Sequence, residues 1–392
     1  MSELARGMEE KEREKVLHFV SSLMGATREY FEAAWRLAPG ALPEHSRIYV
    51  VEGRTVSHMH LFFRRMSLGP ARITVGQIGD VCTDPAYRHR GYGTALLEDS
   101  AEYFRRHGAP FSMIISGVFG FYHHGGYQSF PLRRYVVDLE KAPEHTELRS
   151  GKYYIRRAMR EEDLHSLATC YMEYNRRRPL SIVRDLGYWK KQFWTSRRET
   201  EDGFLVAEKD GRVVAYSRMG PGAFLEAACL PEAADALPAL FGASLQLARK
   251  RRLDKITVYM PEDEPFTGRL KEYGEEEEYL TTLVKVVDLP GLLESVASGL
   301  NHVLEKPVLE GLDGWKVGFH VGGKAGILIC RSDGIEGVEG IPKGVEDVVD
   351  LDDAGMVEML AGRNVPGEGE VRERLVKLFN GKAPYFWPMD TV

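Results

Sequence analysis

The chain has 392 residues, of which 43% are hydrophobic and 28% are charged, and its formal net charge is −6. At roughly 150 residues per domain, this length predicts two or three domains. No apolar run approaches the roughly 20 residues of a membrane-spanning helix, and the polar stretch 1–11 lacks the apolar core of a secretory signal, so we expect a cytoplasmic protein without a membrane partner. The four cysteines are widely separated, which argues against a disulfide framework or a zinc site.

The N-terminal part begins with a helix and a hairpin. Gly7–Glu10 precedes a stretch in which Val16, Phe19 and Val20 recur at helical spacing. Residues 47–57 alternate as strand, tight turn at Gly53 and strand. This pattern is typical of an α/β domain.

The strongest local motif lies at Ile78–Gly93, where a strand (78–83) and an Asp84-Pro85 turn lead into Arg-x-x-Gly-x-Gly at residues 88–93. A helix with an apolar stripe follows and ends before Gly108, and residues 111–116 form the next strand. Glycines allow backbone N–H groups to approach an anion, and a helix N-terminus adds partial positive charge, so a pyrophosphate is the expected ligand. The dinucleotide fingerprint GxGxxG and the phosphate loop GxxxxGK[ST] are both absent.

The middle of the chain repeats the first part. Residues 158–163 open a second helical stretch at an offset of 151 from the first, and residues 204–215 form a second strand-turn-strand at an offset of 157 or 158. A duplicated α/β unit of about 145 residues explains both matches better than chance spacing of two common hairpins. After the strand-like residues 223–230, however, the turn Pro231–Asp235 has neither the arginine nor the glycines of the first motif.

The last segment differs from the rest of the chain in composition and in its predicted elements. Residues 301–392 contain 15 glycines, two β-type runs (315–321 and 326–330) and two helix-like stretches (352–360 and 370–379), which predicts a small α+β domain. This segment has 16 acidic and 10 basic residues, whereas residues 1–300 have 42 of each. The absence of a basic excess argues against nucleic acid as the main ligand, and the aromatic stretch 384–389 is expected to pack against the protein.

The glycine motif resembles the acetyl-CoA loop of the GNAT (Gcn5-related N-acetyltransferase) superfamily. A second landmark of that superfamily, a tyrosine shortly after the fifth strand, matches residues 120–127. Two such units followed by a small α+β domain resemble the enhanced intracellular survival (Eis) family. The resemblance implies two tandem GNAT folds, each a mixed twisted sheet with flanking helices, and a sterol-carrier-protein-like domain. The expected boundaries are 1–148, 149–292 and 293–392, with a coenzyme A site in the first domain alone.

The resemblance also assigns roles. Backbone groups of β-strand residues would pair with the pantetheine arm, and loop amides would hold the pyrophosphate. Tyr122 would be the general acid for the departing thiolate, although it could also be only a packed aromatic residue. The residues expected to bind acetyl-CoA are Val81, Cys82, Thr83, Arg88, His89, Arg90, Gly91, Tyr92, Gly93 and Thr94.

The general base is left open between three carboxylates. In the family the C-terminal carboxylate takes the amine proton, which here would be that of Val392. Family members end in a large aromatic residue, however, and this chain ends in Met389–Val392. Asp80 and Asp390 are the alternatives, and Asp80 could equally be a structural carboxylate.

We therefore expect an N-acetyltransferase that moves acetyl from acetyl-CoA to a primary amine in a ternary complex, without a metal. Small polyamines, aminoglycoside-like amines and lysine side chains are candidate acceptors, and the pocket would be shaped by residues 31–35, 58–63 and the C-terminal tail. The family resemblance also implies a homo-oligomer. The alternatives are a catalytically weak protein that uses the scaffold to bind coenzyme A or a partner, and a standard peptide N-terminal acetyltransferase.

Overall fold

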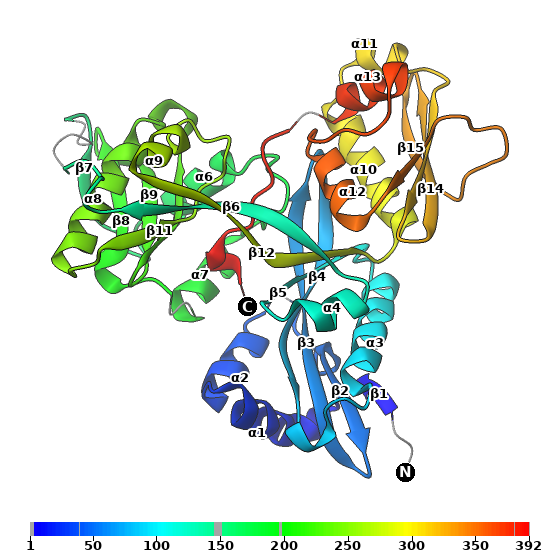
Figure 1. Ribbon diagram of the computed structural model, residues 1–392, viewed down its shortest axis with the longest axis horizontal. Helices are drawn as coiled ribbons and strands as arrows, with labels where there is room; N and C mark the ends of the chain where they lie inside the picture. Colours follow the sequence, from blue (N-terminus) through cyan, green and yellow to red (C-terminus); the bar gives the residue numbers. More distant parts are fainter. Residues whose placement is uncertain (1–3, 39, 145–150, 196–197, 380, 392) are drawn as a thin grey trace. The chain divides into compact units, whose positions relative to one another are not determined.

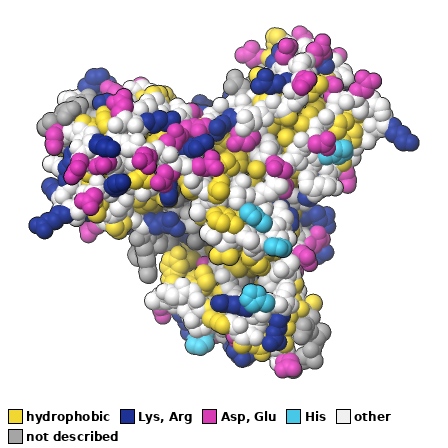
Figure 2. Space-filling model, viewed as in Figure 1, with side chains coloured by type: hydrophobic (Ala, Val, Ile, Leu, Met, Phe, Trp, Pro, Cys, Tyr) yellow, Lys and Arg dark blue, Asp and Glu magenta, His cyan; other side chains and the backbone are white. Residues whose placement is uncertain are grey.

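The structure is a computed structural model that describes residues 4–38, 40–144, 151–195, 198–379 and 381–391 (Figure 1). The chain folds into two compact units. Of the described residues, unit 1 contains those within 4–130 and 280–382, and unit 2 contains those within 131–279 and 383–391. Among the described residues, no helix is both long and apolar enough to cross a membrane. On the face drawn in Figure 2, basic side chains are interspersed with acidic ones.

Unit 1 contains a mixed sheet with the strand order β1, β2, β3, β4, β5, β12. All neighbouring strands are antiparallel except β4 and β5, which are parallel. Two strands, β6 and β12, carry the chain from one unit to the other. The bounds are β1 (Leu4–Gly7), β2 (Ser46–Val51), β3 (Arg54–Leu68), β4 (Ala71–Thr83), β5 (Phe111–Ile115), β6 (Gln128–Asp138) and β12 (Gly274–Val286).

Helices cover both faces of this sheet. α1 (Arg13–Met24) and α2 (Arg28–Arg36) bury Val16, Val20 and Phe31 against one face, which includes Phe62 of β3. α3 (Tyr92–Arg106) packs Leu97 and other apolar residues against the opposite face, and the short α4 (Phe119–His124) joins that cluster. Because alternate β3 side chains point to opposite faces of the sheet, this strand packs against the helices on both faces.

A second sheet of unit 1, with the order β15, β14, β13, β16, is joined to the first by α10. α10 packs on β4 on one side and on β14 and β15 on the other, and Gly299 and Gly337 allow the close approach. Its N-terminus is capped by Asp288, which accepts from Gly291 N at 3.3 Å. The remaining bounds are α10 (Leu289–Val303), α11 (Lys306–Glu310), β13 (Lys316–Val321), β14 (Lys324–Arg331), β15 (Gly334–Glu339), β16 (Val348–Leu351), α12 (Asp353–Leu360) and α13 (Gly369–Leu378).

Unit 2 has the same succession of strand pairings as the first sheet of unit 1. Its order is β7, β8, β9, β10, β11 and residues 131–138 of β6, with only β10 and β11 parallel. α6 packs on β9 and β10, and α8 packs on β8, β9 and β10. The bounds are β7 (Tyr154–Arg157), α6 (Leu164–Tyr174), α7 (Leu186–Thr195), β8 (Phe204–Lys209), β9 (Arg212–Met219), β10 (Ala223–Cys229), α8 (Ala236–Lys250), β11 (Lys255–Val258) and α9 (Thr267–Tyr273).

The fold is therefore mixed α/β with large sheets and flanking helices, as the sequence predicts. Both hairpins, the helix after the glycine motif, and the two predicted strands and two predicted helices of the last segment are confirmed. The second strands of the hairpins continue further than expected, to Leu68 and Met219, and the sequence did not predict β15, β16 or α11. The two early helices start later than expected, at residues 13 and 164. The two expected domain boundaries remain predictions: residue 148 lies outside the described residues, and residue 292 lies within α10.

Candidate active site

The strands β4 and β5 separate in the middle of the first sheet. Their paired residues end at Ile78 and Ile114, and the end of β5 instead bonds to β12, where Ser116 N donates to Thr281 O at 2.8 Å. Beyond Ile78, β4 pairs on its other side with β3, up to Thr83. Among the described residues, the edge of residues 79–83 that faces β5 therefore has no strand partner. An extended ligand can pair with this open edge, which we call the notch.

Of the strand residues expected to bind the cofactor, Val81 and Thr83 lie in this notch and Cys82 points into the core. The Cys82 side chain packs beneath α1 and α2, where burial raises its pKa to about 12, so its thiol behaves as a small apolar group. The Thr83 hydroxyl lies 2.8 Å from the Ser57 hydroxyl.

The glycine loop follows directly and begins α3. Gly91 precedes the helix with φ 81°, and His89 also has a positive φ of 60°. Residue 93 favours glycine for a different reason: a Cβ there would lie 3.0 Å from the Phe121 ring of α4, a tight contact that the ring would have to relieve. The first helical hydrogen bond is Ala95 N to Gly91 O, so the N–H groups of Tyr92, Gly93 and Thr94 have no acceptor within the helix.

Two arginines give this loop a positive rim. Arg88 and Arg90 are exposed, and within the described ranges they hydrogen bond only to backbone carbonyls, Thr83 O at 3.3 Å and Ala86 O at 3.2 Å. The Arg90 guanidinium also lies over the Tyr87 ring at 5.3 Å. Because neither guanidinium bonds a carboxylate of the described residues, both retain their charge for an anion.

Tyr122 lies in α4, next to the start of α3. Its ring is buried with Leu97, Ile114 and Tyr127, and burial raises the pKa of its phenol despite a hydrogen bond with Ser116. The hydroxyl is therefore protonated at neutral pH, as a proton donor must be. Burial in an apolar cluster is equally what a purely structural tyrosine would show.

Asp80 lies at a β-bulge on β4, at the mouth of the notch. The pairing changes from His60 with Gly79 to His58 with Cys82, which leaves one extra residue on β4, and Asp80 adopts φ 50°. The Trp35 indole donates to its carboxylate at 2.7 Å. Asp80 is half-buried and so is open to solvent on part of its surface.

Two histidines of β3 stack on Trp35, and one of them also contacts the Asp80 backbone. Trp35 stacks on His60 at 4.7 Å and on His58 at 5.1 Å. The Nδ1 atom of His58 lies 2.9 Å from the Asp80 carbonyl oxygen and so must donate to it. Burial lowers the pKa of His58 to about 4, so the ring is neutral at pH 7, and its Nε2 atom has no hydrogen-bond partner among the described residues.

A cavity of about 290 Å³ opens beside Trp35 in unit 1. It includes Glu32 and Trp35 from the expected pocket segment 31–35 and His60 from the segment 58–63. Both segments contribute residues to this cavity, and their role in shaping an acceptor pocket remains a prediction. The sequence analysis did not predict the bond from Trp35 to Asp80 or the bulge that turns Asp80 toward α2. The alternation His58-x-His60, on the strand next to the glycine motif, was the one sequence pattern that pointed to this place.

The equivalent position in unit 2 is filled by the chain's own tail. β10 also has a bulge before Glu226 and continues beyond its two pairs with β11. Arg184 bonds Glu226 at 2.5 Å and Asp390 at 2.9 Å, and all three side chains are fully buried. Asp390 thus has a structural environment beneath α6 and α7, whereas Val392 lies outside the described residues.

The aromatic tail is buried, as expected. Tyr385 N donates to Pro179 O at 2.8 Å, and the Trp387 indole donates to Asn175 at 2.9 Å. In the part of the chain that the structure describes, no group of three or more His, Cys, Asp or Glu side chains could hold a metal ion.

Comparisons with known proteins agree with this geometry. Residues 5–130 match the acetyltransferase (GNAT) domain family. That range contains the notch, the glycine loop and Tyr122. No curated protein matches the chain.

Several solved structures match over nearly the whole chain. A probable N-acyltransferase from Enterococcus faecalis V583 is 15% identical, with full coverage of both chains and a TM-score of 0.76. A GCN5-related N-acetyltransferase from Anabaena variabilis is 12% identical, again with full coverage, at 0.71. Eis1 from Mycobacterium abscessus is 15% identical at 0.66, covering 99% of this chain and 100% of its own. At these low sequence identities, the structural similarity shows only that the folds are alike.

Proposed function

We propose that this protein is an N-acetyltransferase that moves acetyl from acetyl-CoA to a primary amine. The observation that carries the proposal is the opening between β4 and β5, which is directly followed by a glycine loop with two uncommitted arginines. Both features lie in the segment that matches the GNAT domain family, and two structural neighbours are described as an N-acetyltransferase and a probable N-acyltransferase.

The chain's residues fit such a cosubstrate. The open edge at Val81 and Thr83 suits the amide groups of a pantetheine arm, which would bind as an added strand. The free N–H groups at the start of α3, with Arg88 and Arg90, suit a pyrophosphate. Cys82 and the loop residues His89, Gly91, Tyr92, Gly93 and Thr94 would shape this site through the backbone.

In the proposed reaction, the amine nitrogen attacks the thioester carbonyl, the C–S bond breaks, and the Tyr122 phenol gives its proton to the departing thiolate. The phenolate then recovers a proton from the attacking nitrogen, which becomes the neutral amide. A lysine-like amine must first lose a proton, which costs about 4.6 kcal/mol at pH 7 for a pKa near 10.4. A carboxylate must accept it. Asp80 is favoured by its position at the bulge, and the Val392 carboxylate is the second candidate.

We further propose that unit 2 is a second GNAT fold without a coenzyme A site. Unit 2 shares the order of strand pairings of unit 1. Its turn at residues 231–235, however, ends in Asp235, whose carboxylate bonds Lys152 at 2.9 Å. A pyrophosphate at this turn would need positive charge instead of a carboxylate. Arg184, Glu226 and Asp390 fill the space below its bulge. The sterol-carrier-like assignment of the last segment, a cytoplasmic location and a homo-oligomer belong to the same proposal.

A transfer assay tests the function. The full-length protein is incubated with acetyl-CoA and a panel containing spermidine, an aminoglycoside and a lysine peptide, and thiol release is measured with and without each amine. Amine-dependent release with formation of the acetyl-amide supports the proposal. Acetyl-CoA binding without amine-dependent release would instead favour a protein that uses the scaffold only to bind coenzyme A.

A further inference from the structure

Trp35 of α2 forms a short hydrogen bond to the carboxylate that is the favoured base of the proposed reaction. Its indole nitrogen donates to the Asp80 carboxylate at 2.7 Å, and Trp35 is only 1% exposed. A hydrogen bond to an ionised carboxylate is stronger than one between neutral groups. Because an indole N–H is a donor only, Trp35 can orient this carboxylate but cannot itself accept the proton of an amine.

The indole is held in place by its own neighbours. Its ring stacks on His60 at 4.7 Å, with the two ring planes 4° apart, and on His58 at 5.1 Å. Phe31, one helical turn earlier in α2, lies 6.2 Å from the indole ring. All three neighbours are buried. The direction of the indole N–H is therefore set by packing within unit 1.

Asp80 is fixed at its backbone as well as at its carboxylate. It lies at the bulge of β4 with φ 50°, an uncommon conformation for a residue that has a side chain. The His58 Nδ1 atom donates to its carbonyl oxygen at 2.9 Å. Two buried side chains, one from α2 and one from β3, thus hold a residue that stays half-buried. The carboxylate is oriented without being enclosed, which a general base requires, since its proton donor must reach it.

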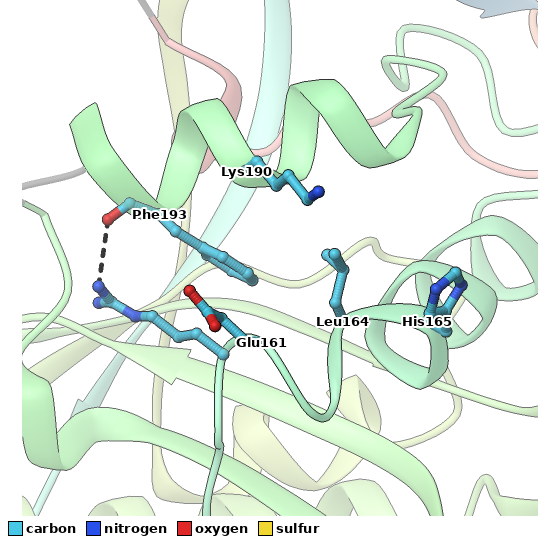
Figure 3. Close-up of a pocket in the computed structure, with 6 residues that line it drawn as sticks. Glu161, Leu164, His165, Lys190 and Phe193 are labelled. Atoms are coloured by element: carbon cyan, nitrogen blue, oxygen red, sulfur yellow. Dashed lines mark hydrogen bonds between the residues drawn. The ribbon is translucent and has the colours of Figure 1, made fainter.

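Unit 2 shows that the succession of elements does not by itself produce such a bond. Its helix α7 takes the place of α2 in the order of elements and also buries a tryptophan, Trp189. The Trp189 indole nitrogen has no hydrogen-bond partner among the described residues. A cavity of about 620 Å³ lies beside α7 (Figure 3), and its lining carboxylate, Glu161, is exposed. The indole-to-carboxylate bond of Trp35 therefore distinguishes the unit that contains the notch.

We propose that Trp35 is a positioning residue, whose indole N–H holds the Asp80 carboxylate in the orientation that accepts the proton of the acceptor amine. This role rests on the proposed function. One N–H bond of the ammonium group breaks as its proton passes to an Asp80 oxygen, the neutral amine attacks the thioester, and Asp80 later releases the proton to water. Trp35 keeps its own proton throughout. A base must lie within about 2.6–3.2 Å of its proton donor, or one water away, so a carboxylate that rotates freely is productive for only part of the time.

Trp35→Phe in the full-length protein tests this role in the transfer assay, with the best amine of the panel. The variant keeps an aromatic ring that can stack on the two histidines, and it lacks the N–H. We expect kcat to fall about 10-fold to 100-fold, while acetyl-CoA affinity measured by calorimetry is retained, because the notch and the glycine loop are unchanged. Trp315→Phe is the matched control. It removes an indole bond to Asp347 of 2.6 Å beside the other sheet of unit 1, and kcat should not change.

A second replacement covers the case in which phenylalanine at residue 35 lowers the melting temperature. The amino acid β-(3-benzothienyl)alanine has the bicyclic shape of tryptophan with sulfur in place of the N–H. Incorporated at residue 35, it removes the hydrogen bond and preserves the packing, so kcat should fall as in Trp35→Phe. A kcat equal to that of the unaltered protein in this form would refute the proposal.

A double-mutant cycle separates positioning from a purely structural role. Asp80→Asn removes the base, so adding Trp35→Phe to it should lower kcat no further. Losses that multiply would overturn the proposal, because Trp35 would then act independently of Asp80. Full turnover in Asp80→Asn would refute both the base and this role of Trp35 and leave acetyl transfer itself standing. If the unaltered protein transfers acetyl to no amine, the proposed function fails, and this role fails with it.

Discussion

Removal of the Asp390 carboxylate is expected to destabilise unit 2 strongly. This carboxylate accepts two hydrogen bonds from Arg184 at 2.9 Å each, and others from Tyr188 at 3.0 Å, Gln192 at 3.1 Å and Tyr171 at 3.3 Å. In Asp390→Ala, Arg184 stays buried and keeps Glu226 as its carboxylate partner within the described residues. Breaking a buried ion pair in this way costs about 3–5 kcal/mol.

For a unit of this size, each kcal/mol lowers the melting temperature by about 2–4 °C, so a decrease of roughly 6–20 °C is expected for the transition of unit 2. Differential scanning calorimetry measures it. Asp254→Ala is the matched control, because Asp254 is exposed in the same unit and should change stability by less than about 0.5 kcal/mol. Acetyl-CoA affinity should be retained, since the glycine loop belongs to unit 1. A melting temperature within about 1 °C of the unaltered protein would refute a structural role for Asp390.

Three further predictions concern the proposed chemistry and the pH dependence. Tyr122→Phe should lower turnover about 10²-fold to 10⁴-fold in the transfer assay with acetyl-CoA affinity unchanged, and full turnover would leave Tyr122 as a packed aromatic residue. Asp80→Asn should lower turnover while a C-terminal extension beyond Val392 does not; the reverse result would identify the terminal carboxylate as the base. Burial raises the pKa of Glu264 above its ordinary value of 4.5, so its ionised form opposes folding at neutral pH. Glu264→Gln should therefore unfold at higher urea concentration than the unaltered protein at pH 7, with the gain disappearing below about pH 4.5, and a gain that persists at low pH would contradict this cause.

The local elements could be predicted because each has a short-range cause. The apolar stripe of Leu97, Ala101 and Phe104 specifies a helix, and the Gly91 position requires a positive φ that the motif itself indicates. The glycine loop was therefore located from the sequence to the residue.

Long-range placement could not be predicted in the same way. The paired residues of β12 and β5 lie more than 160 positions apart in the sequence, and no local pattern indicates that residues 282–286 complete the first sheet. Asp390 was considered as a base because it lies close to the chain end. Its actual partners, Arg184 and the buried residues around it, are brought to it by the folding of unit 2, and the sequence carries no periodic signal for such a cluster.

The same limit applies to Asp80. The sequence places it on the strand before the glycine loop, but the bulge and the bond from Trp35 arise from the pairing of β3 with β4 and the packing of α2. A one-residue change of register cannot be read from the alternation of a strand that is buried on both faces.

Titration of acetyl-CoA into the full-length protein by isothermal calorimetry tests the central claim most directly, alongside the variant Gly91→Val. A valine at this position must adopt the φ of 81° that glycine now holds, which costs about 1–2 kcal/mol and shifts the loop amides away from the pyrophosphate. The proposed site predicts one acetyl-CoA per chain and a large loss of affinity in Gly91→Val. Two equivalent sites per chain, or binding that is unchanged in the variant, would contradict it.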